Sequence, residues 1–471
     1  MSHLLNPDLV ATTALRLVGP DPANWVADRP GVDHNVMLVG GGQTGCALAF
    51  ALRRAGIGRV TLIDAAPDAG TAGSGLASAH AGVPKGLTGP ELGIPGLGFQ
   101  VWYESRFGKR AYASLAGIPG LAWADYLGWY RRFLKIPVRY GTRLLRIEPA
   151  DGCLRLHLEA GGRTVTETAR KVVLATGLAG SGAPYVPTVL AGLPRACLSH
   201  AGESIDFDAV RGKAVGIVGA GASAFDAACL ALESGAASVH LFARRDAIAS
   251  VPVAQARAYP GAYDNYWHLP DAVRWRQAVR WREAGSAPAP EAVRRASASQ
   301  RFHLHLAAPW RHAGVEAGQV VADAADGTFR FDHVIAATGH SADPALRPEL
   351  AEFADRILRW RDRYAPPATE ADAYLGSHAY LGEGYEYLEK TPGEAAFLRN
   401  VHVHNASGDV SFGLPTGDLA GMRRDIPALA ARISRDLFLD DLPEHERRMS
   451  GPVAPTFSEA AYAPAVWEAG A

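Results

Sequence analysis

The sequence predicts an α/β protein with two nucleotide-binding units, one inserted in the other. Two glycine-rich turns carry this prediction: Gly40-Gly41-Gly42-Gln43-Thr44-Gly45 after an apolar run at 36–39, and Gly219-Ala220-Gly221-Ala222-Ser223-Ala224 after a run at 215–218. Each turn precedes a helical pattern and a second apolar strand. This order places the pyrophosphate of a dinucleotide at a helix N-terminus. The predicted fold is therefore a pair of Rossmann-like, three-layer dinucleotide-binding domains.

The first unit has an acidic residue at the end of its second strand. Residues 60–63 form an apolar run, and Asp64 follows it. A carboxylate there accepts hydrogen bonds from ribose hydroxyls and repels a 2′-phosphate. We therefore expect FAD in the first unit, held by Gly40, Gly42, Gln43, Thr44, Gly45 and Asp64.

The second unit has two arginines at the corresponding place. The strand expected at 239–243 is followed by Arg244 and Arg245. Guanidinium groups bind a 2′-phosphate well, although arginines at a strand end are often only solvated. We therefore expect NADPH in the second unit, held by Gly219, Gly221, Ala222, Ser223, Ala224, Arg244 and Arg245.

A repeated Ala-Thr-Gly marks the expected domain boundaries. It occurs at 175–177 and at 337–339, each time after a buried apolar strand. Small residues let the backbone approach another backbone or a cofactor, so we assign Thr176, Gly177, Thr338 and Gly339 to the cofactor sites. The expected division is a FAD domain over 33–200 and 333–440, an NADPH domain over 201–332, and terminal extensions over 1–32 and 441–471.

Other segments are assigned from their patterns. Strands are expected near 143–147, 154–158, 164–168 and 401–404, and helices near 121–134 and 426–439, whereas residues 1–33 show little periodicity. Residues 250–300 are rich in aromatic residues and arginine, and we expect a helical insertion that packs on the NADPH domain and lines a substrate cleft. Two late Gly-Asp pairs, ending in Asp409 and Asp418, are alternative neighbours of the flavin phosphate or ribitol.

Composition excludes several classes of function. A net charge of −1 gives no reason to expect nucleic-acid binding. No stretch has the length of a membrane span, and the N-terminus lacks a secretory pattern, so we expect a cytoplasmic protein. The four cysteines, Cys46, Cys153, Cys197 and Cys229, form no closely spaced pair, which disfavours a disulfide reductase. No metal site is predicted.

Two such turns around an Ala-Thr-Gly crossover, without a redox cysteine pair, resemble the single-component (class B) flavin-dependent monooxygenases. This group includes flavin-containing, N-hydroxylating and Baeyer–Villiger enzymes, and the resemblance covers most of residues 33–440. Members often carry F-x-G-x-x-x-H before the second turn, and here only His200 of that pattern is present, within 194–200. His200 is a candidate catalytic residue, with a structural role as the alternative. The Baeyer–Villiger signature is not intact.

The resemblance implies a reaction. NADPH reduces the flavin, the reduced flavin forms a C4a-hydroperoxide with O2, and one oxygen atom is transferred to a small organic substrate. Because the Baeyer–Villiger signature is broken, N-hydroxylation is preferred over ketone oxygenation. An NADPH-dependent flavin reductase that passes electrons to a partner, and a non-catalytic flavoprotein, are the alternatives. The sequence leaves the substrate and homo-oligomer formation open.

Overall fold

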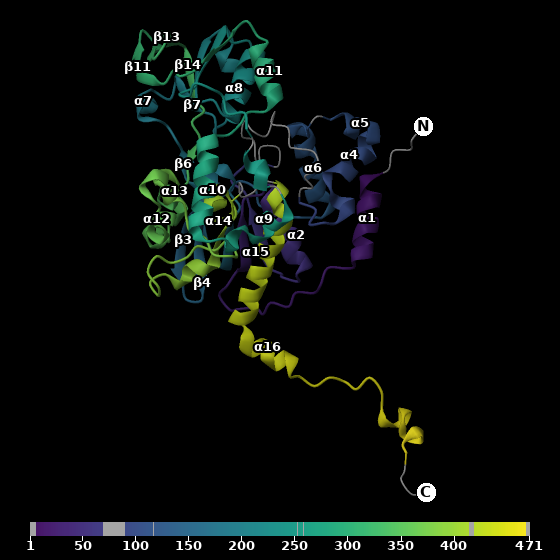
Figure 1. Cartoon of the computed structure of the whole chain (residues 1–471). Helices are drawn as coiled ribbons and strands as arrows, with labels where there is room; N and C mark the ends of the chain where they lie inside the picture. Colours follow the sequence, from purple (N-terminus) through teal and green to yellow (C-terminus); the bar gives the residue numbers. More distant parts are fainter. Residues whose placement is uncertain are drawn as a thin grey trace.

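The computed structural model describes residues 6–68, 90–115, 117–251, 253–257, 259–413 and 419–467. Two large sheets organise the chain, one in the lower and one in the upper half of Figure 1. The predicted pair of Rossmann-like units is present, and the chain returns to the first sheet after completing the second.

The first sheet has the strand order β2-β1-β5-β4-β3, with β16 also paired to β5. Its parallel part consists of β1, β2, β16 and the second half of β5, and its antiparallel part consists of β3, β4 and the first half of β5. One strand, β5, thus replaces the two expected near 164–168 and 171–174, because the ladder continues through both runs. The strands are β1 (His34–Val39), β2 (Val60–Ile63), β3 (Thr142–Ala150), β4 (Cys153–Ala160), β5 (Arg163–Leu174) and β16 (Val401–Val403).

Helices surround this sheet and bury its apolar strands. The long helix α15 packs on α2, the helix that follows the first glycine turn. α15 starts earlier than the expected 426–439. The helices are α2 (Gln43–Arg54), η1 (Pro95–Leu97), α4 (Phe99–Phe107), α5 (Lys109–Ser114), α6 (Gly120–Phe133), α15 (Leu419–Asp440) and α16 (Leu442–Met449).

The N-terminal lead-in contains a helix that its weak periodicity does not predict. Helix α1 (Pro7–Val18) has proline in its first turn, and the Asn6 side chain accepts a hydrogen bond from the backbone N–H of Asp8 at 2.8 Å. An Asn cap followed by proline is a helix-start signal. This helix was therefore missed from the sequence, in which only weak periodicity was noted here.

The second sheet is fully parallel, with the order β10-β9-β8-β14-β7. Helices α8 and α11 cover one face, and α7 with a three-stranded antiparallel sheet, β11-β12-β13, covers the other. The elements are α7 (Thr188–Ala191), β7 (Leu198–His200), β8 (Ala214–Val218), α8 (Ala222–Glu233), β9 (Ser238–Phe242), α11 (Pro290–Ser297), β10 (Phe302–His305), β11 (Trp310–Glu316), β12 (Gln319–Ala324), β13 (Gly327–Phe331) and β14 (His333–Ala336).

Hydrogen bonding groups residues 198–336 around the second glycine turn, because β7 and β14 both belong to its sheet. The expected boundaries at 200/201 and 332/333 lie at the end of β7 and at the start of β14. The expected NADPH domain therefore leaves out both of these strands. Two short connections, β6 (Ala183–Pro184) and β15 (His340–Ser341), pair with each other where the chain passes between the units.

The aromatic and arginine-rich insertion is helical, as expected, but it does not pack only on the second unit. It comprises η4 (Val253–Arg257), α9 (Pro260–Asn265), η5 (Tyr266–His268) and α10 (Asp271–Ala284). Trp275 and Ala278 of α10 form a buried cluster with Trp360, Tyr380 and Val410 from the C-terminal part of the chain. In Figure 1, α10 lies between the upper and lower parts of the molecule.

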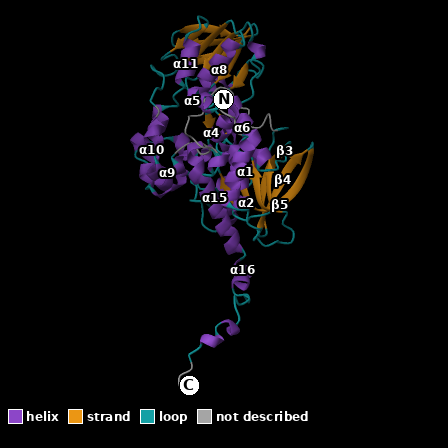
Figure 2. Cartoon of the chain, turned by 90° about the vertical axis from the view of Figure 1, so that its right-hand side faces the viewer, coloured by secondary structure: helices purple, strands orange, loops and turns teal. Residues whose placement is uncertain are grey.

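Short helices fill the segment between β14 and α15, and two more lie in the C-terminal tail. They include η6 (Pro344–Leu346), η7 (Pro348–Leu350), η8 (Ala354–Arg356), α12 (Trp360–Arg363), η9 (Ala368–Glu370), α13 (Ala373–Ser377), η10 (Ala396–Asn400), η11 (Ala406–Gly408), α14 (Asp409–Phe412), η12 (Glu459–Ala461) and η13 (Ala463–Ala465). The tail after α16 extends away from the body in both overall views (Figures 1 and 2). Among the described residues, no helix is both long enough and apolar enough to cross a membrane.

Candidate functional site

The first glycine turn connects β1 to α2 and is held against the end of β5. Gly40 has φ +114°, and a Cβ there would lie 2.2 Å from the carbonyl oxygen of Ala175. A Cβ on Gly45 would lie 2.0 Å from the carbonyl oxygen of Gly40, whereas a Cβ on Gly42 would meet nothing within 4 Å. The outer glycines are therefore needed for packing. Gly42 leaves open space at the start of the helix, where a phosphate can approach the backbone.

Other predicted residues of the first site lie around this turn. Asp64 accepts hydrogen bonds from the backbone N–H groups of Gly41 at 2.6 Å and Ala66 at 2.7 Å. The side-chain oxygen of Gln43 accepts a hydrogen bond from the Trp123 indole at 3.1 Å, and Thr44 is buried. The carboxylate of Asp64 thus lies at the turn itself and fixes its shape.

The second glycine turn repeats this backbone geometry between β8 and α8. Gly219 has φ +124°, and a Cβ there would lie 2.2 Å from the carbonyl oxygen of Ala337. The third position is Ala224, which is fully buried, and Ala222 and Ser223 form the half-buried first turn of α8. Gly221 faces Ser286, whose carbonyl oxygen would lie 3.5 Å from an added Cβ. The end of the insertion therefore borders the second turn.

The two arginines after β9 have different surroundings. Arg244 is exposed. Arg245 is half-buried and donates hydrogen bonds to the carbonyl oxygens of Ala284 at 3.2 Å and Arg282 at 3.5 Å, at the C-terminal end of α10. Cations at a helix C-terminus interact favourably with its unpaired carbonyl groups. Arg245 therefore joins the second unit to α10, and Arg244 has its guanidinium available to solvent.

Each Ala-Thr-Gly segment lies beside a glycine turn. Ala175 donates to the Val39 carbonyl at 2.9 Å, and Ala337 donates to the Val218 carbonyl at 2.8 Å. Gly177 and Gly339 have φ +63° and +85°, and Cβ atoms on either would meet nothing within 4 Å. The hydroxyls of Thr176 and Thr338 both form hydrogen bonds, the first with Asn405 and the second with the carbonyl oxygen of Tyr185. The two Ala-Thr-Gly segments therefore occupy equivalent positions in the structure as well as sharing a sequence.

Asn405 is a site residue that the sequence did not single out. It follows β16, is buried, and donates from Nδ2 to the Thr176 hydroxyl and to the Gly180 carbonyl, both at 3.1 Å. Its Oδ1 accepts a hydrogen bond from the backbone N–H of Ser407 at 3.0 Å. Its position after a late strand was the available signal, but Thr176 and Gly180, to which it donates, lie more than two hundred residues away.

His200 is buried at the end of β7 and lies beside His340, with ring centroids 5.2 Å apart. Its Nδ1 accepts a hydrogen bond from the Gly202 N–H at 3.0 Å. Burial lowers the pKa of His200, against the opposing effects of the Gly339 backbone and Glu203. Burial also lowers the pKa of His340. His200 is therefore neutral at pH 7 and lies where the chain enters and leaves the second unit.

The two late aspartates differ in what the structure says of them. Asp409 begins α14 and is half-buried, and its charge helps to raise the pKa of Tyr374, which burial raises to about 12. Asp418 lies outside the described residues. The charge of Asp409 therefore acts on Tyr374 in α13.

Two buried histidines lie at β16, His402 within the strand and His404 directly after it. Burial lowers the pKa of His402 to about 3, and its Nδ1 lies 2.8 Å from the Gly384 carbonyl. His404 lies 3.4 Å from Asp425, the pKa of which is lowered by His404 and Arg424 although burial acts the other way. No group of three or more His, Cys, Asp or Glu side chains within the described ranges could hold a metal ion.

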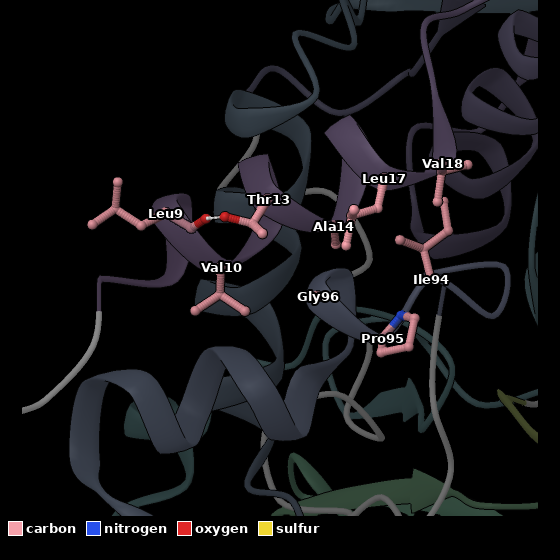
Figure 3. Close-up of a pocket in the computed structure, with 9 residues that line it drawn as sticks. All are labelled: Leu9, Val10, Thr13, Ala14, Leu17, Val18, Ile94, Pro95 and Gly96. Atoms are coloured by element: carbon pink, nitrogen blue, oxygen red, sulfur yellow. Dashed lines mark hydrogen bonds between the residues drawn. The ribbon is translucent and has the colours of Figure 1, made fainter.

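An apolar cavity of about 550 Å³ lies away from the glycine turns, between α1 and η1 (Figure 3). Its only polar side chain is Thr13, which donates to the Leu9 carbonyl at 2.9 Å. It has no titratable group, so it cannot supply acid–base or charge-stabilising chemistry. The nine lining residues are Leu9, Val10, Thr13, Ala14, Leu17, Val18, Ile94, Pro95 and Gly96.

Comparisons of the sequence with known proteins give two matches. The family model described as L-lysine 6-monooxygenase/L-ornithine 5-monooxygenase matches residues 106–292. A FAD-dependent urate hydroxylase of Xanthomonas campestris pv. campestris is 39% identical over 450 residues, which cover 94% of this chain and 93% of that protein.

Solved structures show the same fold at low identity. The ornithine hydroxylase of Pseudomonas aeruginosa is 20% identical with a TM-score of 0.66, over 87% of this chain and 100% of that chain. The ornithine N-hydroxylase of Kutzneria sp. 744, in a structure with reduced FAD, NADP+ and L-ornithine, is 18% identical with a TM-score of 0.65, over 86% of this chain and 99% of that chain.

Proposed function

The chain belongs to the single-component (class B) flavin-dependent monooxygenases, and from this premise we propose that it hydroxylates, with O2, a small organic substrate that has an anionic group. It is an oxidoreductase, and its cofactors are FAD and NADPH. We place FAD at the first glycine turn and NADPH at the second. When bound, NADPH supplies a hydride to FAD, and reduced FAD activates O2 for transfer of one oxygen atom to the substrate.

The main support for this assignment is that the N-termini of α2 and α8 have no side-chain cap. Neither α2 nor α8 has a side-chain cap on its N-terminal glycine, Gly42 or Gly221, and neither has an acidic residue in its first turn. The first backbone N–H groups of a helix need a partner, and an uncapped N-terminus without negative charge attracts a phosphate. The open space beside Gly42 fits a pyrophosphate group.

The residues of the chain have separate tasks in this proposal. The backbone of each turn binds and orients a pyrophosphate, and Asp64 keeps the first turn in shape through the Gly41 N–H. Arg244 recognises the 2′-phosphate of NADPH. His200, neutral because it is buried, positions the segment that follows β14. Trp275 of the insertion packs in a buried cluster with Trp360 of α12, and this cluster excludes water from the region between the units, which limits side reactions with water.

Urate is the first candidate substrate, because the relative that matches almost the whole chain is a urate hydroxylase. N-hydroxylation of an amino acid is the second candidate, because the family model that matches residues 106–292 describes lysine and ornithine monooxygenases. Both kinds of substrate have an anionic group at neutral pH, because urate is an anion and an amino acid has a carboxylate. A cytoplasmic location and homo-oligomer formation stay predictions.

The test uses the purified protein with its flavin. We expect a yellow protein that NADPH bleaches under anaerobic conditions faster than NADH does. In air, NADPH consumption should rise on addition of urate, or of L-ornithine or L-lysine, without an equal release of hydrogen peroxide. Flavin that keeps its colour under anaerobic NADPH would contradict the proposal. Equal peroxide release with every substrate would favour the reductase alternative.

A further inference from the structure

Buried basic side chains divide into two groups. Among the described residues, five lysines or arginines are less than a tenth exposed as whole residues, and four of them form ion pairs with a carboxylate. The pairs are Arg170–Asp441 at 2.6 Å, Lys171–Asp436 at 3.0 Å, Arg274–Asp271 at 2.5 Å and Arg359–Asp343 at 3.0 Å. The fifth is Arg257, for which no described carboxylate lies within ion-pair distance.

Arg257 lies at the end of η4, in the insertion, and is 9% exposed. Its guanidinium lies over the rings of Trp281 at 5.4 Å and Tyr266 at 5.9 Å, and its buried Nη1 has no hydrogen-bond partner among the described residues. A buried charge without a counter-charge is unfavourable, and proteins retain one where it meets a ligand. The planar fork of arginine matches carboxylates and other planar anions.

The two aromatic neighbours of Arg257 connect it to both parts of the site. Tyr266 packs against Gly413, where an added Cβ would lie 2.3 Å from the tyrosine ring, and Gly413 ends α14 shortly after β16. Trp281 belongs to α10, the helix that leads to Ser286 beside the second glycine turn. Arg257 therefore lies between the segment that follows the first sheet and the segment that borders the second turn.

We infer that Arg257 binds the anionic group of the substrate, in an aromatic-walled position formed with Tyr266 and Trp281. This rests on the proposed function, because it deepens the same site. The ligand class is a small organic anion, either a carboxylate such as that of an amino acid or a planar anion such as urate. The contact is a charge-assisted hydrogen bond from the unpaired Nη1, strengthened by the low polarity of its surroundings.

The sequence limits which carboxylate of this chain could pair with Arg257 instead of a substrate. In the residues outside the described ranges, the carboxylate side chains are Asp418 and Glu468. An ion pair between Arg257 and Asp418 is the alternative within this chain. The phosphates of NADPH are the alternative source of the anion. The experiment separates all three.

The test compares Arg257→Met with Arg274→Met and with Arg276→Gln, an exposed arginine of the same insertion. Without substrate, removal of an unpaired buried charge should raise the melting temperature or leave it unchanged, whereas Arg274→Met leaves Asp271 unpaired and should lower it. In equilibrium titrations of the FAD-loaded protein, Arg257→Met should bind urate or L-ornithine about 10–100-fold more weakly, because a hydrogen bond to a charged group is lost. NADP+ affinity should not change.

Several outcomes would overturn the inference. A lower melting temperature for both Arg257→Met and Asp418→Asn would assign Arg257 to an internal ion pair. Weaker NADP+ binding with unchanged urate and L-ornithine binding would assign the anion to the cofactor. Wild-type protein that binds neither anion would also refute it. Anaerobic bleaching by NADPH, measured on the same samples, reports separately on the proposed function.

Discussion

The two glycine turns share a backbone and differ in their side chains. In both, the first glycine has a positive φ and lies against the carbonyl oxygen of an Ala-Thr-Gly segment, Ala175 in one and Ala337 in the other. In the first unit, the Asp64 carboxylate accepts a hydrogen bond from the Gly41 N–H group of the turn. In the second unit, Arg244 is exposed to solvent and Arg245 donates a hydrogen bond to the end of α10. We therefore propose that the shared turn geometry binds the pyrophosphate and that the residues after the next strand select the nucleotide.

The first glycines should be the most sensitive positions. Gly40→Ala should abolish FAD binding and lower the free energy of unfolding by about 2 kcal/mol or more, because the added methyl group meets a backbone oxygen and φ is unfavourable. Gly219→Ala should leave the protein yellow and abolish NADPH binding. Flavin absorbance after gel filtration and titration with NADP+ measure the two effects.

Gly42→Ala is the matched control, because an added Cβ has nothing within 4 Å. Its effect on unfolding of the flavin-free protein should stay within about 0.5 kcal/mol. The comparison between the two cradles would fail if Gly219→Ala released the flavin while Gly40→Ala retained it.

Arg244 should decide between the two nicotinamide nucleotides. Arg244→Ala should raise KM for NADPH about 10–100-fold, because a charge-assisted hydrogen bond contributes about 1.5–3 kcal/mol, and should leave KM for NADH unchanged. Arg245→Ala should instead lower the melting temperature and weaken both nucleotides alike, since its partners are backbone carbonyls of α10. If Arg244→Ala raised KM for NADPH and for NADH equally, Arg244 would not contact the 2′-phosphate.

Asp64→Asn should have a smaller effect on the first cradle. Asparagine retains one oxygen acceptor but loses the charge that strengthens the bond to the Gly41 N–H. We expect about tenfold weaker FAD binding in a titration of flavin-free protein, with the fold unchanged. An unchanged FAD affinity would mean that the carboxylate contributes nothing beyond the shape of the turn.

The loss of stability at acid pH should differ least between the two units, because each contains a histidine with a pKa lowered by burial. The pKa of His402, in the first unit, is lowered by burial to about 3, and that of His240, in the second, to about 4. The unfolded chain takes up these protons near pH 6.5, whereas the folded chain does not, so stability is full above pH 6.5 and falls as the pH drops toward 4. Each histidine contributes a slope of about 1.4 kcal/mol per pH unit in that window.

Urea unfolding at pH 7, 6 and 5 tests this sign. His402→Asn keeps an N–H donor for the Gly384 carbonyl and does not titrate, so its stability should depend less on pH than that of the wild type. His240→Asn should behave likewise, in the second unit. A steeper acid loss in either variant would show that the histidine is charged in the folded protein.

The sequence predicted the features that short stretches encode. Both turns, the paired Ala-Thr-Gly segments and the return of the late strand β16 follow from local composition, and the structure confirms all of them. The family, the class of reaction and both cofactors followed from the same motifs, and the comparisons support them. Turn geometry depends on a few adjacent residues, which is why it can be recognised without a structure.

Features that depend on distant partners were not predictable in this way. Asn405 obtains its role from Thr176 and Gly180, and Arg170 meets Asp441, so neither has a local signal. The packing of α10 on the C-terminal segment was missed because its aromatic residues suit a core on either unit. The assignment of individual cofactor contacts and of domain boundaries therefore stays a prediction.

Helix α10 has a mechanical consequence for any motion between the units. It contains 14 residues and so spans about 21 Å. Trp275 is buried in a cluster near its start, and the carbonyl oxygen of Ala284 at its end accepts a hydrogen bond from Arg245. One deleted residue would turn its far end by about 100° and shorten it by about 1.5 Å, which would break one attachment. The number of residues in α10 therefore sets the spacing between the buried cluster around Trp360 and the strand end that carries Arg245.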